Sequence, residues 1–282
     1  MEDLITKATE DFVSGMQKSG NFARRQVIAL IRAMDTVDGR LISTDRNNQL
    51  IDGASIGIQQ VAISGTFNSR VNKVVNSIPK IKQETIKAFV RRNGPLSLNT
   101  VNQLKEAEAS ITSLVRQSIG EQSVINEIMT PMISILNQMV VNQMEVDDAL
   151  RFVGEKIPSL FTQFAHVRVA TPLQLFVRDI NKIMADSKGL EWFKYSGPTG
   201  PSALGNPIRD FCLHKVGGVY LKSEIEAWPA QESPWDGEIP GTNSFSIFIN
   251  LGGFNCRHDL VPVKSRDVPT KDVNRAKNKG LI

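Results

Sequence analysis

Residues 186–198, DSKGLEWFKYSGP, separate two kinds of sequence in this 282-residue chain. Before this stretch, apolar residues recur at the three- and four-residue spacing of helices. After it, short segments of β-like composition alternate with Gly-Pro turns, and all three tryptophans and both tyrosines occur from Trp192 onward. The sequence therefore predicts an α+β fold. We expect an elongated, mostly helical region over residues 1–188, a small β-containing Cys/His module over 189–265 and a basic tail over 266–282.

The start of the first region predicts two helices and a turn. Residues 2–18 carry an apolar stripe, and Asn21 is expected to cap a second helix that Asp38-Gly39 breaks. A short non-helical segment over residues 41–48 is expected to form a hairpin. Residues 50–78 have a weak helical pattern and are expected to form the next helix.

Prolines divide the rest of the first region. Pro79 is expected to open a short basic helix that Asn93-Gly94-Pro95 ends, and Thr130-Pro131 to cap another. Four of the eight methionines lie between residues 129 and 144. At helical spacing they indicate a core or a helix contact rather than an open binding groove. The remaining histidine, His166, is expected to be a structural or a surface residue.

Within the module, strands are expected at Val219–Leu221 and at the alternating Phe245–Ile249. Ser223–Trp228 is expected to form one or two helical turns. The glycines at 217–218 and 252–253 are interpreted as turns rather than phosphate-binding loops.

Composition narrows the classes of protein. Hydrophobic residues make up 41% and charged residues 22%, as in soluble globular domains. No apolar run of membrane-spanning length is expected, and the N-terminus resembles no secretory signal. Two cysteines in so long a chain predict a reducing compartment rather than a disulfide scaffold.

The net charge of +4 comes from the C-terminal end. Between residues 264 and 280 the acidic residues Asp267 and Asp272 face six basic ones, Lys264, Arg266, Lys271, Arg275, Lys277 and Lys279. A solvated arm is the simpler interpretation of this tail. Contact with a phosphate backbone or an acidic partner is the alternative.

Both cysteines occur in Cys-x-His pairs, Cys212/His214 and Cys256/His258. On extended segments, residues two apart share a face, so these four side chains are candidate ligands for one structural zinc ion. A Cys212–Cys256 disulfide and two thiols that simply pack together are the alternatives.

An enzymatic interpretation uses the same residues. His214 and His258 would act as general acid and base, with Arg209 or Arg257 stabilising a phosphoryl transition state and Glu224 as a further base. This describes a nuclease or toxin-like enzyme. No Walker loop, GxGxxG, HExxH or GxSxG motif occurs, so catalysis is not the expected function.

An ordered set of motifs resembles a known family. The set is KYSGP at 194–198, RDFC at 209–212, GVY at 218–220, SEI at 223–225, GGFNCRH at 252–258 and VPV at 261–263. It resembles the C-terminal module of tailed-phage minor head proteins, the head morphogenesis family (Mu F-like and SPP1 gp7-like proteins). The motif residues are Arg209, Phe211, Tyr220, Glu224, Gly253, Asn255 and Arg257. Ile208 departs from the pattern, which has threonine there.

This resemblance covers about residues 190–265 and implies a role. The chain would be a virion structural protein, a minor head or head–tail neck component, acting in head morphogenesis at the portal vertex and in DNA packaging or ejection. It implies portal, capsid and neck proteins as partners, oligomeric assembly, no membrane, and the host cytoplasm as the place of assembly. A DNA-binding assembly factor acting through the basic tail is the remaining alternative.

Overall fold

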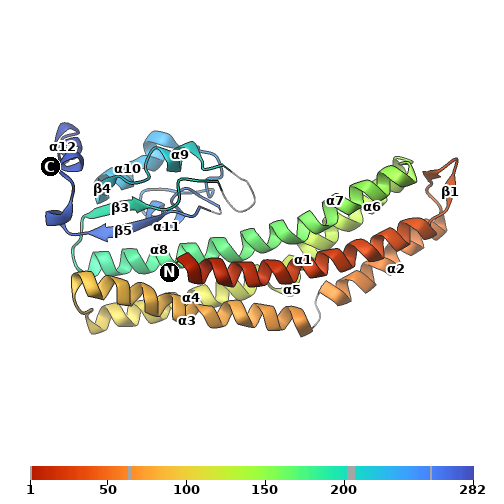
Figure 1. The fold of residues 1–282 in the computed structure, drawn as a ribbon, viewed down its shortest axis with the longest axis horizontal. Helices are drawn as coiled ribbons and strands as arrows, with labels where there is room; N and C mark the ends of the chain where they lie inside the picture. The colour runs from red at the N-terminus through yellow and green to blue at the C-terminus, as the bar shows by residue number, and fades with distance from the viewer. Residues whose placement is uncertain (1, 63–64, 202–206, 255) are drawn as a thin grey trace. The chain divides into compact units, whose positions relative to one another are not determined.

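The computed structural model describes residues 2–62, 65–201, 207–254 and 256–282. Their contacts form two compact units. We call Glu2–Ser77 with Leu114–Ala170 the helical unit, and Ile78–Ser113 with Thr171–Ile282 the C-terminal unit. The fold is mostly helical with a few short strands, which confirms the α+β prediction (Figure 1).

The helical unit is built on two long helices, α1 (Glu2–Ala33) and α7 (Val146–Ala165), which pack together. Phe12 and Met16 of α1 and Ile157 and Phe161 of α7 are buried. A Cβ atom at Gly20 would lie 3.1 Å from Phe161, so this glycine permits the close approach of the helices. The predicted break at Asn21 is wrong, because burial along this face favours one uninterrupted helix.

A hairpin follows α1. Its strands β1 (Thr36–Val37) and β2 (Arg40–Leu41) are joined by Asp38 and Gly39, both with positive φ, the two-residue turn that Asp-Gly favours. Fully buried Asn47 bonds the main chain of Asp35 and Ile42. The hairpin thus lies at 36–41, earlier in the chain than predicted.

Seven further helical segments lie before α8 in the described part of the chain. They are α2 (Asp45–Ala62), α3 (Gly65–Asn93), α4 (Leu98–Ser118), α5 (Glu121–Val124), the π-helical η1 (Ile125–Met129), α6 (Thr130–Val141) and the π-helical η2 (His166–Ala170). Pro79 lies inside α3 rather than opening a helix, although α3 ends at Asn93 as predicted. Thr130 has helical φ and ψ, so Thr130-Pro131 continues a run through the π turn instead of capping it.

The run Glu121–Val141 contains an 18-residue window of mean hydropathy 1.3 and is, by length and composition, apolar enough to span a membrane. By length and composition, the expectation that no such run exists is wrong. Met129, Met132 and Met139 are buried and Met144 is half-buried, while η1 contacts α2 and α7, and α6 contacts α2. Three of the four methionines are thus core residues of the helical unit, as predicted.

The C-terminal unit contains an antiparallel sheet of order β4-β3-β5, formed by β4 (Val219–Leu221), β3 (Trp192–Ser196) and β5 (Asp259–Val263). Helix α8 (Thr171–Ser187) packs against β5 and the short α11 (Ile247–Asn250). The other helices are α9 (Asp210–Leu213), α10 (Lys222–Glu232), the 3-10 turn η3 (Ser265–Asp267) and α12 (Thr270–Asn278). By contacts, Ile78–Ser113, α8 and residues 266–282 all group with the module. The boundaries at 188 and 265 stay predictions.

Successive side chains of β3 point to opposite faces of the sheet, and each face packs into a separate core. Phe193 and Tyr195 join one core with Ile225, Trp228, Phe248 and Leu260, while Trp192 joins another with Val219, Leu221 and Ala276. Strand β4 and the helix at Ser223–Trp228 are confirmed. The strand predicted at Phe245–Ile249 is wrong: this segment turns into α11.

Candidate metal centre

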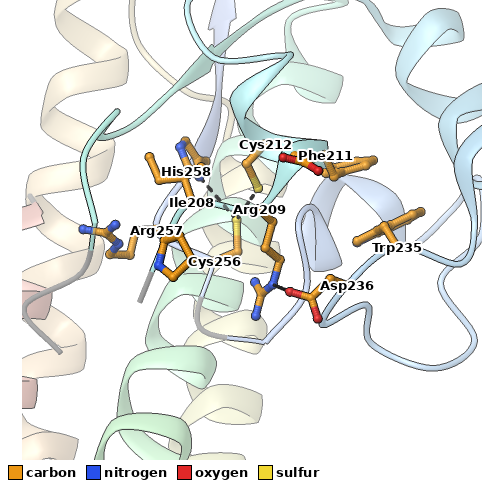
Figure 2. A pocket seen from close by; sticks show the side chains of 11 residues that line it. Ile208, Arg209, Phe211, Cys212, Trp235, Asp236, Cys256, Arg257 and His258 are labelled. Carbon is orange, nitrogen blue, oxygen red and sulfur yellow. Dashed lines mark hydrogen bonds and ion pairs between the residues drawn. The ribbon is translucent and has the colours of Figure 1, made fainter. Parts of the chain in front are cut away.

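Three of the four predicted ligands meet in the C-terminal unit. Cys212 lies on α9, and Cys256 and His258 lie on the segment before β5. The two Sγ atoms are 3.8 Å apart, and the Cys256 Sγ is 3.7 Å from the His258 Nδ1 (Figure 2). All three ligand atoms lie within 4.8 Å of one another, and all three residues are buried.

His214 does not join this cluster and is exposed. The prediction assumed extended backbone for both Cys-x-His pairs. Cys212 lies instead in the helical turn α9, where residues two apart point about 200° apart. The segment from Cys256 to His258 leads directly into β5, so there the shared face is realised.

Two glycines make room for the thiols and the imidazole. A Cβ atom at Gly252 would lie 2.3 Å from the Cys212 Sγ and 2.9 Å from the Cys256 Sγ. A Cβ atom at Gly197 would lie 2.5 Å from the His258 ring. Each glycine therefore leaves space that only the cluster's own side chains occupy.

The imidazole of His258 has a defined tautomer. Its Nε2 lies 2.9 Å from the Pro198 carbonyl oxygen, which only accepts, so Nε2 carries the proton. In the neutral imidazole the lone pair is then on Nδ1, the atom that faces Cys256. A metal-binding histidine uses this same arrangement, donating its second N–H to a carbonyl while the other nitrogen binds the ion.

Arg178 of α8 holds the segment that carries these ligands. Its side chain is buried, and its guanidinium donates to the carbonyls of Ile249 and His258 at 2.9 Å each, to Asn250 at 3.4 Å and to Cys256. Arg178 is not among the site residues predicted from the sequence. A signal was present, because Arg178 interrupts the apolar stripe of Phe176, Val177 and Ile180.

The cysteines share an asymmetric electrostatic environment. Burial raises the pKa of Cys256, but the hydrogen bond with Cys212, the charge of Arg178 and His258 together hold it well below the usual thiol value. The hydrogen bond with Cys256 and burial raise the pKa of Cys212 far above that value. Burial likewise raises the pKa of Tyr195, and Cys256 and Cys212 add to the effect.

A pocket of about 730 Å³ lies beside the cluster. Among the residues described there, Arg209 and Arg257 contribute positive charge, and Phe211 stacks on Trp235 at 4.3 Å between centroids (Figure 2). Arg209 donates to the Gly252 carbonyl at 3.1 Å and pairs with Asp236 at 3.3 Å. Arg257 donates to the carbonyls of Gly200 and Pro201. Both guanidinium groups are thus engaged in main-chain contacts.

The other motif residues are structural in their contacts. Buried Glu224 pairs with Arg275 at 3.3 Å and Lys279 at 2.8 Å, and the Arg275 guanidinium lies 4.3 Å from the Tyr220 ring. Gly253 has φ +93°, and a Cβ atom there would overlap the Gly237 carbonyl. Asn255 lies outside the described residues. Ile208 packs partly buried against the core around Trp228.

The tail is not a solvated arm, so that interpretation is wrong. Helix α12 buries Ala276 against Trp192, Val219 and Leu221. Arg275 and Lys279 pair with Glu224, Lys264 donates to the Arg92 carbonyl, and Arg266 pairs with Asp267 at 3.8 Å. Lys271 and Lys277 are exposed.

No family model, curated protein or solved structure matches this chain. The site therefore has to be interpreted from its own geometry. A buried Cys2His cluster with a fixed tautomer and a supported ligand loop has the chemistry of a metal site.

Proposed function

We propose that this protein is a structural component of a tailed-phage particle, a minor head or head–tail neck protein that acts in head morphogenesis. One observation carries the proposal: the residues that carry the sequence resemblance build one packed module. Phe211, Cys212, Glu224, Cys256 and His258 are all buried there. A resemblance scattered over unrelated surface positions would have had no such physical basis.

The contacts of these residues favour a scaffold over a catalyst. The His258 Nε2 is bonded to Pro198 and its Nδ1 faces Cys256, and His214 lies outside the cluster. Glu224 neutralises two cations of α12. A general base needs a free lone pair that substrate can reach. The acid–base pair expected of a nuclease is therefore a poorer interpretation.

We include in the proposal one structural zinc ion held by Cys212, Cys256 and His258. Two sulfurs bound to a tetrahedral zinc at about 2.3 Å lie about 3.8 Å apart, and sulfur and imidazole nitrogen about 3.6 Å apart. The corresponding distances here are 3.8 Å and 3.7 Å. A bound ion would connect α9 to the segment before β5 and so stabilise a module with two small cores.

Mass spectrometry of purified particles of the parent phage tests the structural role. We expect the chain in mature particles, at a low and fixed number of copies relative to the major capsid protein. Comparison before and after DNA release distinguishes the head interior, from which the chain would be lost, from the neck. Absence from both mature particles and assembly intermediates would overturn the proposal.

Truncating the tail would not test whether its positive charges bind DNA. Removing residues after Val263 would also remove Ala276 from the core, so loss of binding would not isolate the charges. Lys271→Glu and Lys277→Glu change exposed cations only. Salt-dependent DNA binding that both variants weaken would support the assembly-factor alternative.

A further inference from the structure

We infer that the phenol oxygen of Tyr195 is the fourth ligand of the metal centre, which makes it a closed four-coordinate site. This inference rests on the zinc ion included in the proposed function. It assigns a ligand outside the two Cys-x-His pairs. It also distinguishes a structural site, which has four protein ligands, from a catalytic one, which keeps a position open for water.

The Tyr195 hydroxyl is an unexplained polar group at this place. The residue is 0% exposed, and its oxygen has no hydrogen-bond partner among the described residues. Tyr195 belongs to the same buried cluster as Cys212 and Cys256, so its side chain packs among the residues that carry the two thiols. Burying a hydroxyl without a partner is destabilising, and coordination to an ion would remove that cost.

Tyr195 is held in place at both its main chain and its ring. Its N–H donates to the Gly218 carbonyl at 2.9 Å, and its carbonyl accepts from Gly217 at 2.8 Å. It pairs with Leu260 across β3 and β5. Its ring centroid lies 5.3 Å from that of His258 and 6.0 Å from that of Trp228. The ring is thus held beside His258 by the sheet rather than by a flexible loop.

The donor set is chemically complete. Two thiolates, one imidazole nitrogen and one phenol oxygen give the four ligands of a tetrahedral ion. On binding, the two thiols lose their protons to solvent and the phenol keeps its own, so the two positive charges of the zinc ion balance the two thiolates. The glycine at 252 leaves both sulfurs unobstructed.

The experiment compares Tyr195→Phe with Tyr220→Phe in the full chain. These are the two tyrosines of the sequence, and the Tyr220 hydroxyl donates instead to the Lys215 carbonyl. Each reduced protein is loaded with Zn²⁺ or Co²⁺, and the bound metal, the affinity and the visible Co²⁺ spectrum are measured. Unfolding is followed with and without metal.

We expect one ion per chain in the unaltered protein and in Tyr220→Phe, with the same Co²⁺ spectrum. Tyr195→Phe should bind about 10- to 100-fold more weakly with an altered spectrum. Without metal, Tyr195→Phe should be at least as stable as the unaltered protein, because it removes an unpartnered hydroxyl. With metal it should be less stable. A tyrosine with only a packing role would not make the variant at least as stable without metal and less stable with metal.

Two outcomes would overturn the inference, and they are distinguishable. Stoichiometric metal with identical spectra and affinities for Tyr195→Phe and the unaltered protein would leave the zinc in place and exclude the phenol as a ligand. Failure of the reduced, folded protein to bind any metal would exclude the ion altogether. The particle test of the structural role is independent of both.

Discussion

Arg178 is the residue on which the ligand segment depends most. One buried guanidinium satisfies carbonyls of four residues between 249 and 258. Two of these carbonyls lie at the end of α11 and two on the segment that leads into β5, so one side chain supplies donors to the backbone of both. Loss of the donor would leave several buried acceptors unsatisfied.

Arg178→Met should therefore lower the free energy of unfolding of the C-terminal unit by about 3 kcal/mol or more. Arg266→Met is the matched control, because its side chain is 77% exposed and pairs with Asp267 at only 3.8 Å. The control should cost less than about 1 kcal/mol. Urea unfolding followed by tryptophan fluorescence measures both, since all three tryptophans lie in this unit. Equal losses would show that the carbonyl contacts contribute little.

Two aspartates of α8 should give opposite dependences of stability on pH. Burial raises the pKa of Asp179, and Lys182 only partly offsets it. Burial also acts on Asp186, but hydrogen bonds from Lys182 and Lys222 lower its pKa overall. A raised folded-state pKa means stability that is lost as pH rises through that pKa. A lowered one means stability lost as pH falls through it.

Asp179→Asn should consequently raise the melting temperature at neutral pH, and the gain should vanish below about pH 4, where the carboxyl of the unfolded chain is protonated. Asp186→Asn should lower the melting temperature at neutral pH, and that loss should also vanish in acid. Thermal unfolding across this pH range checks both. Parallel pH profiles for the two variants would contradict the assignment.

Among the helices and strands, the sequence predicted those that a local pattern determines. Strand β4, helix α10 and the end of α3 at Asn93 follow from composition, apolar period and glycines. Phe245–Ile249 did not, because its alternation competes with Asn243. That side chain accepts from the N–H groups of Phe245 and Ser246 and so starts α11. Strand β5 ends in a Val-Pro-Val segment whose pairing with β3 is set by tertiary contacts.

The metal site, like the helices and strands, could be predicted only where a local sequence pattern determines it. The Cys-x-His spacing identified Cys212, Cys256 and His258, but only the backbone conformation excludes His214. Arg178 and Tyr195 come from segments 78 and 61 residues before Cys256, so their convergence depends on the packing of α8 and the sheet. Spacing in the sequence carries no information about such distances.

Helix α12 is an element whose role can be tested separately from its charge. Ala276 is fully buried against Trp192, Val219 and Leu221, so Ala276→Glu would place a carboxylate in that core. We expect a loss of about 2–4 kcal/mol and faster amide exchange in β4. Lys277→Glu, one residue along and exposed, should change stability by less than about 0.5 kcal/mol. Slow exchange in β4 of Ala276→Glu would show that the sheet does not depend on α12.

For the whole molecule, the two units have different means of stabilisation. The helical unit buries long apolar stripes of α1 and α7, whereas the C-terminal unit has two small cores beside the cluster of Cys212, Cys256 and His258. Metal removal with a chelator should therefore increase amide exchange within 171–282 and leave Glu2–Ser77 and Leu114–Ala170 unchanged.

Cys256→Ser should reproduce the effect with metal present, because it removes one ligand, whereas His214→Ala should not, because that side chain lies outside the cluster. If the thiols only packed together, Cys256→Ser would cost about 1–3 kcal/mol and the chelator would have no effect. Hydrogen-exchange mass spectrometry distinguishes the two, and an increase spread evenly over both units would contradict the separation of their cores.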